Sequence, residues 1–217
     1  ELVYEDEICI ICRVDGGDTK KTFLAKTLKN PSLTQQEIAN FKHEVRVLQE
    51  NDISGVPKVV SNLEDQGSFT ILSEDFKGIT LLRYIADNKV SLAVFFDIAI
   101  QIATIISEIH SKGLVHKSIN PSTILYSPKT TELRIIDFST SSSAKSEILG
   151  RSTNQPLKYS LPYMSPEQTG RLNQSLDYRT DFYSLGVVLY ELATGRLPFQ
   201  ATDLLELVHA QIALMPE

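Results

Sequence analysis

Glu44 is the first residue whose position in the sequence points to chemistry. It lies three residues after Phe41 and four before Leu48, on the apolar face of an expected helix, and no basic residue stands three or four positions away. A carboxylate on a buried face needs a cation from elsewhere in the fold. Lys26, which ends the apolar run 23–25, is the candidate partner. Taken singly, each residue is better explained as an ordinary solvated charge.

Further polar residues follow in a fixed order. Segment 116–123 reads His-Lys-Ser-Ile-Asn-Pro-Ser-Thr, and Asp137 follows the apolar residues Ile135 and Ile136, where a loop is expected to begin. A carboxylate at such a strand end is well placed to hold a metal ion. Met-Ser-Pro-Glu at 164–167 and Asp-Phe-Tyr-Ser-Leu-Gly at 181–186 come later.

The elements that must position these residues are mostly strands before residue 75. Asp-Gly-Gly-Asp at 15–18 is typical of a hairpin turn, and Thr34 with Glu37 forms a helix capping box. Ile38, Phe41, Val45 and Leu48 continue that helix at helical spacing. We expect strands at 8–12, 22–25, 56–60 and 69–72.

Helices dominate after a junction near 74–78. Isoleucines at helical spacing predict a central helix over 98–109 that ends before Gly113, and a second apolar helix over 182–193 ends before Gly195. The Ser-, Thr- and Lys-rich segment 137–160 predicts a long surface loop. Other expected elements are a helix at 204–214 and short strands at 114–115, 123–126 and 133–136.

In their order and spacing, these motifs resemble those of the eukaryotic-type Ser/Thr protein kinase family, over nearly the whole chain. Residues 163–171 with 177–181 are similar to kinase modules at the N-terminus of large hybrid sensor histidine kinases. The resemblance implies an α+β fold of two lobes, a β-rich N-lobe at 1–75 and a mainly helical C-lobe at 76–217. It also implies two more helices after residue 217, so we expect the C-lobe to be incomplete.

The resemblance implies ATP and Mg²⁺ as cofactors and assigns residues to them. Lys26 would bind the α- and β-phosphates and be positioned by Glu44, while Asp137 would coordinate Mg²⁺. The backbone from Glu74 to Phe76 would form the hinge that binds adenine.

Other residues receive structural roles from the resemblance. His116 and Phe138 would stack with Leu48 inside the protein, and Asp181 would brace the backbone of the catalytic loop. Glu167 belongs to the Pro-Glu motif and is expected to be structural.

Several positions depart from the family pattern. Ser118 stands where the family has the catalytic aspartate, and loss of such a base costs roughly 10² to 10⁴ in rate. Thr123 replaces the asparagine that holds a second Mg²⁺, and Asn120 replaces a lysine that contacts the transferred phosphate. Leu24 replaces a small alanine against adenine and should narrow the pocket.

The glycine-rich loop of the family is also missing. Counted back from Lys26, its glycines would fall at Tyr4, Asp6 and Cys9, and no glycine precedes Gly16. Glycine serves there because the backbone must approach phosphates closely. The acidic residues at 5–7 would also repel a triphosphate.

We therefore expect a pseudokinase, a regulatory module of a larger signalling protein of the two-component type, which binds ATP and Mg²⁺ with little or no phosphotransfer. Two alternatives remain open. In the first, the chain is an active Ser/Thr kinase in which Asp137 and Mg²⁺ alone suffice for phosphotransfer. In the second, it is a nucleotide-independent scaffold in which the Lys26–Glu44 pair is structural.

Composition narrows the partners. Acidic residues outnumber basic ones by 27 to 21, giving a net charge of −6, and this argues against nucleic acid. Asp97, Gln101 and Glu108 interrupt the most apolar stretch, so no membrane span is expected. Two cysteines cannot form a disulfide framework, which favours a cytoplasmic protein. The expected partners are other domains of the same polypeptide or signalling proteins.

Overall fold

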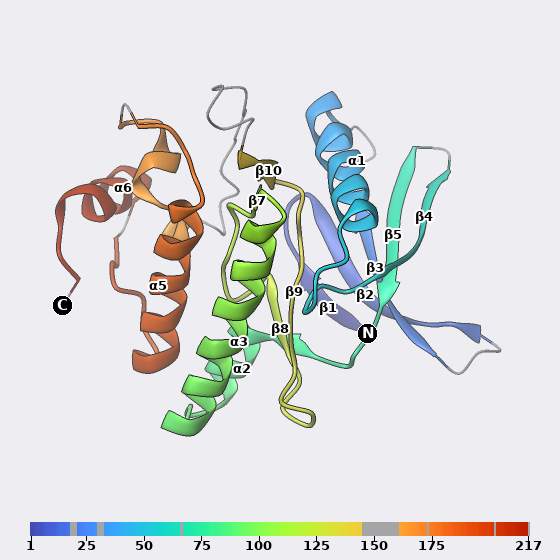
Figure 1. Cartoon of the computed structure of the whole chain (residues 1–217), viewed down its shortest axis with the longest axis horizontal. Helices are drawn as coiled ribbons and strands as arrows, with labels where there is room; N and C mark the ends of the chain where they lie inside the picture. Colours follow the sequence, from blue (N-terminus) through green and yellow to red (C-terminus); the bar gives the residue numbers. More distant parts are fainter. Residues whose placement is uncertain are drawn as a thin grey trace.

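Two blocks of different secondary structure meet at the segment 75–78 (Figure 1). The computed structural model describes residues 1–17, 21–29, 33–65, 67–144, 161–172, 174–201 and 203–216. A strand-rich block with one helix precedes the junction and a mainly helical block follows it. This is the expected α+β architecture.

The first block is an antiparallel sheet of five strands in the order β1-β2-β3-β5-β4. Lys26 lies inside β3, opposite Ile11 of β2 and Ile71 of β5, and not at the end of a strand as expected. The expected strand at 56–60 begins only at Val59, because a turn at 53–56 and then Pro57, which has no N–H to donate, precede it. The strands are β1 (Leu2–Glu5), β2 (Cys9–Asp15), β3 (Thr22–Leu28), β4 (Val59–Asp65) and β5 (Ser68–Glu74).

Helix α1 (Gln35–Glu50) packs on this sheet. The expected capping box is present, with the Thr34 side chain accepting from Glu37 N and the Glu37 side chain accepting from Thr34 N. The helix buries Phe41, whose ring meets Phe69 of β5 edge to face at 5.6 Å. Glu44 is buried on the same helix, so the helix carries a charge into the block.

Helix α3 (Leu92–Ser111) occupies the centre of the second block, beside α5 (Arg179–Thr194) (Figure 1). Gly113 and Gly195 follow these two helices with positive φ, as expected. Among the described helices, α3 alone is long and apolar enough to cross a membrane, which we had not expected from its interrupting polar residues. Its buried face belongs to the main core, through Ile98, Ile102, Ile105, Ile106 and Ile109.

Short elements complete the second block. Helices α2 (Leu81–Asp87) and α6 (Leu204–Ala213) flank it, and two 3-10 helices cover Leu161–Tyr163 and Pro166–Thr169. Strands β6 (Ile79–Thr80), β8 (Ile124–Tyr126) and β9 (Leu133–Ile135) form a small sheet, and β7 (Leu114–Val115) pairs with β10 (Ser142–Ser143).

The expected surface loop at 137–160 is wrong in its first part. Asp137, Phe138, Ser141 and Ser142 are buried, because β10 pairs with β7 and draws this segment against the helical block. Residues 145–160 lie outside the described residues.

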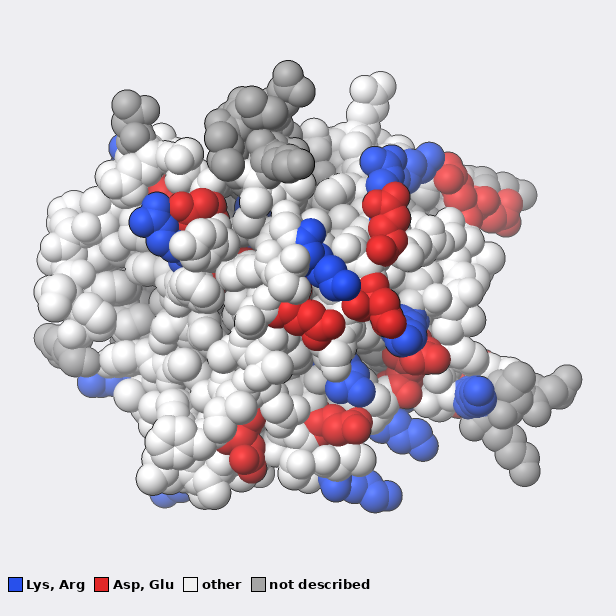
Figure 2. Space-filling view, in the orientation of Figure 1, with Lys and Arg blue, Asp and Glu red and all other residues white. Residues whose placement is uncertain are grey.

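Charged residues are unevenly placed on the face shown in Figure 2. Acidic and basic side chains alternate around the strand-rich block, while the surface over α5 and α6 is mostly uncharged. No broad basic area is visible on this face.

Candidate functional site

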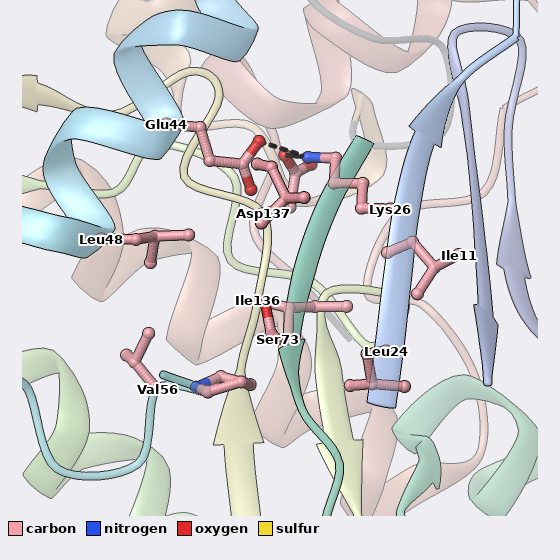
Figure 3. A pocket seen from close by; sticks show the side chains of 11 residues that line it. Ile11, Leu24, Lys26, Glu44, Leu48, Val56, Ser73, Ile136 and Asp137 are labelled. Atoms are coloured by element: carbon pink, nitrogen blue, oxygen red, sulfur yellow. Dashed lines mark hydrogen bonds and ion pairs between the residues drawn. The ribbon is translucent and has the colours of Figure 1, made fainter. Parts of the chain in front are cut away.

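Lys26 joins the two blocks through its ammonium group (Figure 3). Its Nζ lies 2.5 Å from Glu44 Oε2 on α1 and 2.6 Å from Asp137 Oδ1, which follows β9. The exposed fractions of Lys26, Glu44 and Asp137 are 9%, 2% and 6%. One cation therefore serves two buried carboxylates, and the partner inferred for Glu44 from the sequence is the partner in the structure.

The protonation states follow from this sharing. Burial alone would raise the pKa of Asp137, but the charge and hydrogen bond of Lys26, with a hydrogen bond from Ser139, lower it to about 2. Burial likewise works against the charge of Lys26, and the two carboxylates overcome it, so the pKa of Lys26 is raised well above its usual value. For Glu44, burial prevails over Lys26 and the pKa is raised.

Helix α1 also holds the turn after Asp137. Glu44 Oε1 accepts a hydrogen bond from Phe138 N at 3.2 Å. On the neighbouring residue, His43 Nε2 lies 3.1 Å from Ser141 Oγ, which itself donates to Phe138 O at 2.7 Å. Consecutive residues of α1 thus bind both ends of one short turn, and no sequence pattern predicts the contribution of His43.

Asp181 of α5 holds the backbone of segment 116–123. Its carboxylate accepts from His116 N at 2.9 Å and from Lys117 N at 2.7 Å, and it lies 2.8 Å from His110 Nε2. Lys117 and Asp137 both have a φ of 68°, an unfavourable conformation for a residue with a side chain. Such strain persists where surrounding contacts fix the backbone, as they do here.

The side chains of Asn120 and Thr123 serve their own loop. Asn120 Oδ1 accepts from Ser122 N and Thr123 N, and its Nδ2 donates to Ser118 O. Thr123 Oγ1 donates to Ser118 O at 2.8 Å. Ser118 itself is 5% exposed and brings a hydroxyl, with no charge, to this position.

Two other groups of expected structural residues lie together. The rings of His116 and Phe138 meet edge to face at 4.6 Å, and Leu48 packs against the core cluster that contains Phe138. Burial lowers the pKa of His116, which keeps it neutral. Glu167 accepts from Thr180 Oγ1 at 2.7 Å, next to the start of α5.

The space between the two blocks is largely filled by apolar side chains. Ile11 and Leu24 of the sheet form one continuous buried cluster with Leu125 and Ile136 of the second block. The cavity beside Lys26 (Figure 3) offers about 40 Å³ to the centres of water molecules, which is room for a few waters. Leu24, which was expected to narrow the pocket, lines this small cavity.

The junction is held by an ion pair that sequence reasoning missed. Arg13 Nε lies 2.6 Å from Asp75 Oδ2, and Arg13 Nη2 donates to Gly78 O at 2.8 Å. Thr22 Oγ1 adds a hydrogen bond to Asp75 at 2.8 Å, and the Asp75 side chain is fully buried. The expected hinge residue Glu74 is exposed. Glu74 and Phe76 line a separate, polar hollow of about 430 Å³ and not the cavity beside Lys26.

These residues fit ATP and Mg²⁺ poorly in the described conformation. The cavity beside Lys26 is small and lined mostly by apolar side chains, and Asp137 is already bound to Lys26 and Ser139. Within the described part of the chain, no group of three or more His, Cys, Asp or Glu side chains is arranged to hold a metal ion. Mg²⁺ sites built from one or two carboxylates depend on the substrate phosphates for further ligands.

The chain is similar to several curated protein kinases. It is 30% identical over 195 residues to a probable serine/threonine-protein kinase of Clostridium acetobutylicum, which covers 88% of the chain and 29% of that protein. It is 31% identical over 164 residues to the serine/threonine-protein kinase PrkC of Bacillus subtilis, covering 75% of the chain and 24% of PrkC. The chain thus spans less than a third of the length of these relatives.

Another match is shorter but has a higher sequence identity. Over 54 residues, a quarter of the chain and 2% of the relative, the chain is 56% identical to hybrid signal transduction histidine kinase G of Dictyostelium discoideum. The family model described as "Protein kinase domain" matches residues 10–216. Members of this family use ATP and Mg²⁺ in general. With the two-block fold, the Lys26–Glu44 pair and a match over nearly its whole length, the chain belongs to the protein kinase family.

Proposed function

We propose that this chain is a regulatory module with the protein kinase fold that does not itself transfer phosphate. The observation that carries the proposal is the serine at position 118, where the resemblance places a catalytic aspartate. A serine hydroxyl cannot act as the carboxylate base that orients a substrate hydroxyl and takes its proton.

The neighbouring side chains do not make up for this loss. Asn120 and Thr123, which stand at positions that contact the phosphate and a metal ion in the family, are bound to backbone groups of their own loop. Phosphoryl transfer depends almost entirely on positioning and electrostatics. The loop therefore supports neither proton removal nor charge stabilisation.

The assembled state of the site supports a binding role. Asp181 holds segment 116–123, while Lys26 and Glu44 hold Asp137 and Phe138, all through the chain's own side chains. Loops held by such internal contacts present a defined surface to a partner. The similarity to a hybrid histidine kinase favours a role toward other domains of the same polypeptide or toward signalling proteins.

Phosphotransfer by the full-length protein tests the proposal. Wild type, Lys26→Met and Ser118→Asp are incubated with labelled ATP and Mg²⁺, and acid-stable phosphate on Ser and Thr is counted. We expect wild type to equal Lys26→Met. Mg²⁺-dependent incorporation by wild type that disappears in Lys26→Met would overturn the proposal.

The second candidate is an active Ser/Thr kinase. The observation that favours it is the contact of Lys26 with both Glu44 and Asp137, which matches the arrangement that the family uses to bind phosphates and Mg²⁺. The same assay decides, because this candidate requires activity in wild type with Ser118 in place.

A further inference from the structure

The turn between β1 and β2 is closed by one of its own carboxylates. Asp6 Oδ1 accepts hydrogen bonds from the backbone N–H groups of Ile8 and Cys9, each at 2.7 Å. The backbone N–H of Asp6 donates to Cys9 O at 3.0 Å, and Asp6 is only 7% exposed. An anion supplied by the chain itself therefore occupies two backbone donors of the turn.

Those donors are of the kind that bind phosphate. Successive backbone N–H groups in a turn form a concave anion site, and carboxylate and phosphate oxygens compete for it. Asp6 is tethered beside the donors, so its effective concentration there is high and an external phosphate must displace it. The expected repulsion by the acidic residues at 5–7 is thus only part of the effect.

Tyr4 fills the space beneath the turn. Its hydroxyl donates to Asp6 Oδ2 at 2.9 Å, and its ring packs against the cluster of Ile11, Leu24, Leu125 and Ile136. Burial, and next the negative charge of Asp6, raise the pKa of Tyr4, and the charge of Asp137 adds to this. The phenol therefore stays neutral as a donor, within electrostatic reach of Asp137.

We propose that Asp6 and Tyr4 occupy the nucleotide cleft from within. Asp6 binds the backbone donors that would otherwise bind phosphate, and Tyr4 lies in the apolar space below. The Asp6 carboxylate therefore excludes nucleoside triphosphates. This inference rests on the proposed function and names the residues that turn the ligand away. Leu24 and Leu125 narrow the cleft for any purine, whereas Asp6 acts on the phosphates.

Hydrogen–deuterium exchange of the full-length protein tests this at the site itself. Exchange of residues 4–12 is followed in wild type, Asp6→Asn and Glu7→Gln, with millimolar ATP and Mg²⁺ or with adenosine. Glu7 is the matched control, because its exposed carboxylate carries the same charge in the same turn. The amide oxygen of Asp6→Asn can still accept from the two N–H groups, but it lacks the charge that strengthens those hydrogen bonds and repels phosphate. We therefore expect ATP to leave wild type and Glu7→Gln unchanged and to protect Asp6→Asn, with an affinity at least about tenfold higher. Adenosine should not distinguish Asp6→Asn from wild type.

A second variant separates the two roles. Tyr4→Ala removes the ring and leaves Asp6 on the turn. The protection of residues 4–12 by adenosine and by ATP should therefore increase equally. If Asp6→Asn does not fold, wild type and Tyr4→Ala still decide. Protection of wild-type residues 4–12 by ATP overturns the inference, as does a larger gain for ATP than for adenosine in Tyr4→Ala.

The outcomes also separate this inference from the proposed function. ATP protection of wild type without phosphotransfer overturns the role of Asp6 and leaves the proposed function standing. Phosphotransfer by wild type overturns both. If wild type shows neither ATP protection nor phosphotransfer, and ATP protects only Asp6→Asn, the inference and the proposed function are both supported.

Discussion

Replacing Lys26 by methionine should cost the protein several kcal/mol of folding stability. The substitution keeps the length of the side chain and removes the cation that Glu44 and Asp137 share. Breaking a buried ion pair from one side costs about 3–5 kcal/mol, because the remaining charge stays buried and unpaired. Here two carboxylates lose their partner, so we expect the upper end of this range, a large part of a typical stability of about 5–15 kcal/mol.

The pH dependence gives this prediction a distinctive sign. The pKa of Asp137 falls from 3.8 to about 2 on folding, which corresponds to roughly 2 kcal/mol of stability present above pH 4 and lost as the pH falls toward 2. Glu44, whose pKa is raised, contributes in the opposite direction. Without Lys26, burial raises the pKa of both carboxyls. The variant then takes up protons between pH 7 and pH 4, and its stability approaches that of wild type.

Urea unfolding at pH 7 and pH 4 measures both parts. Lys29→Met is the control, because Lys29 forms an exposed ion pair with Glu5, and losing that pair should cost much less than losing Lys26. The reasoning is refuted if Lys26→Met costs no more than Lys29→Met at pH 7. It is also refuted if the gap between Lys26→Met and wild type widens as the pH falls.

Two further substitutions test how the blocks are held together. Gly55→Ala should cost about 2–4 kcal/mol in urea unfolding, because φ is +82° and the new Cβ would lie 2.4 Å from side-chain atoms of Ile105. Gly17→Ala, with φ +59° and nothing within 4 Å, should show only the smaller cost of the strained backbone; equal costs would contradict the clash. Asp75→Asn should cost about 2–3 kcal/mol at pH 7, since it removes the carboxylate that Arg13 binds at the junction. Hydrogen bonds of Asp75 to Arg13 outweigh burial and lower the pKa of Asp75, so the cost should shrink as the pH falls through that lowered value; a cost that is constant down to pH 3 would contradict this.

Much of the site could be predicted because its signals are local. The capping box before α1 and the glycines after α3 and α5 mark helix ends through interactions with near neighbours. Periodicity placed Glu44 on the buried face of α1, and burial then required a cation. The chemical loss at Ser118 is visible in the sequence as soon as the order of motifs is recognised.

Other parts of the site could not be predicted. β1 and β10 are short, and each exists only because a neighbouring strand pairs with it. Pairing of β10 with β7 buries the segment after Asp137, although its composition is typical of a surface loop. The binding of His43 to Ser141 joins residues that are 98 positions apart and leaves no pattern in either segment.

The sequence by itself determined every described α-helix except α2, most strands, the pairing of Lys26 with Glu44 and the missing carboxylate at position 118. Only the tertiary structure decided that Lys26 also binds Asp137, that Arg13 and Asp75 hold the junction, and that Asp6 turns back onto its own loop. The reason is physical. Helix and strand signals arise from residues a few positions apart, whereas the choice of ion-pair partner depends on which charges packing brings within a few ångströms and shields from water.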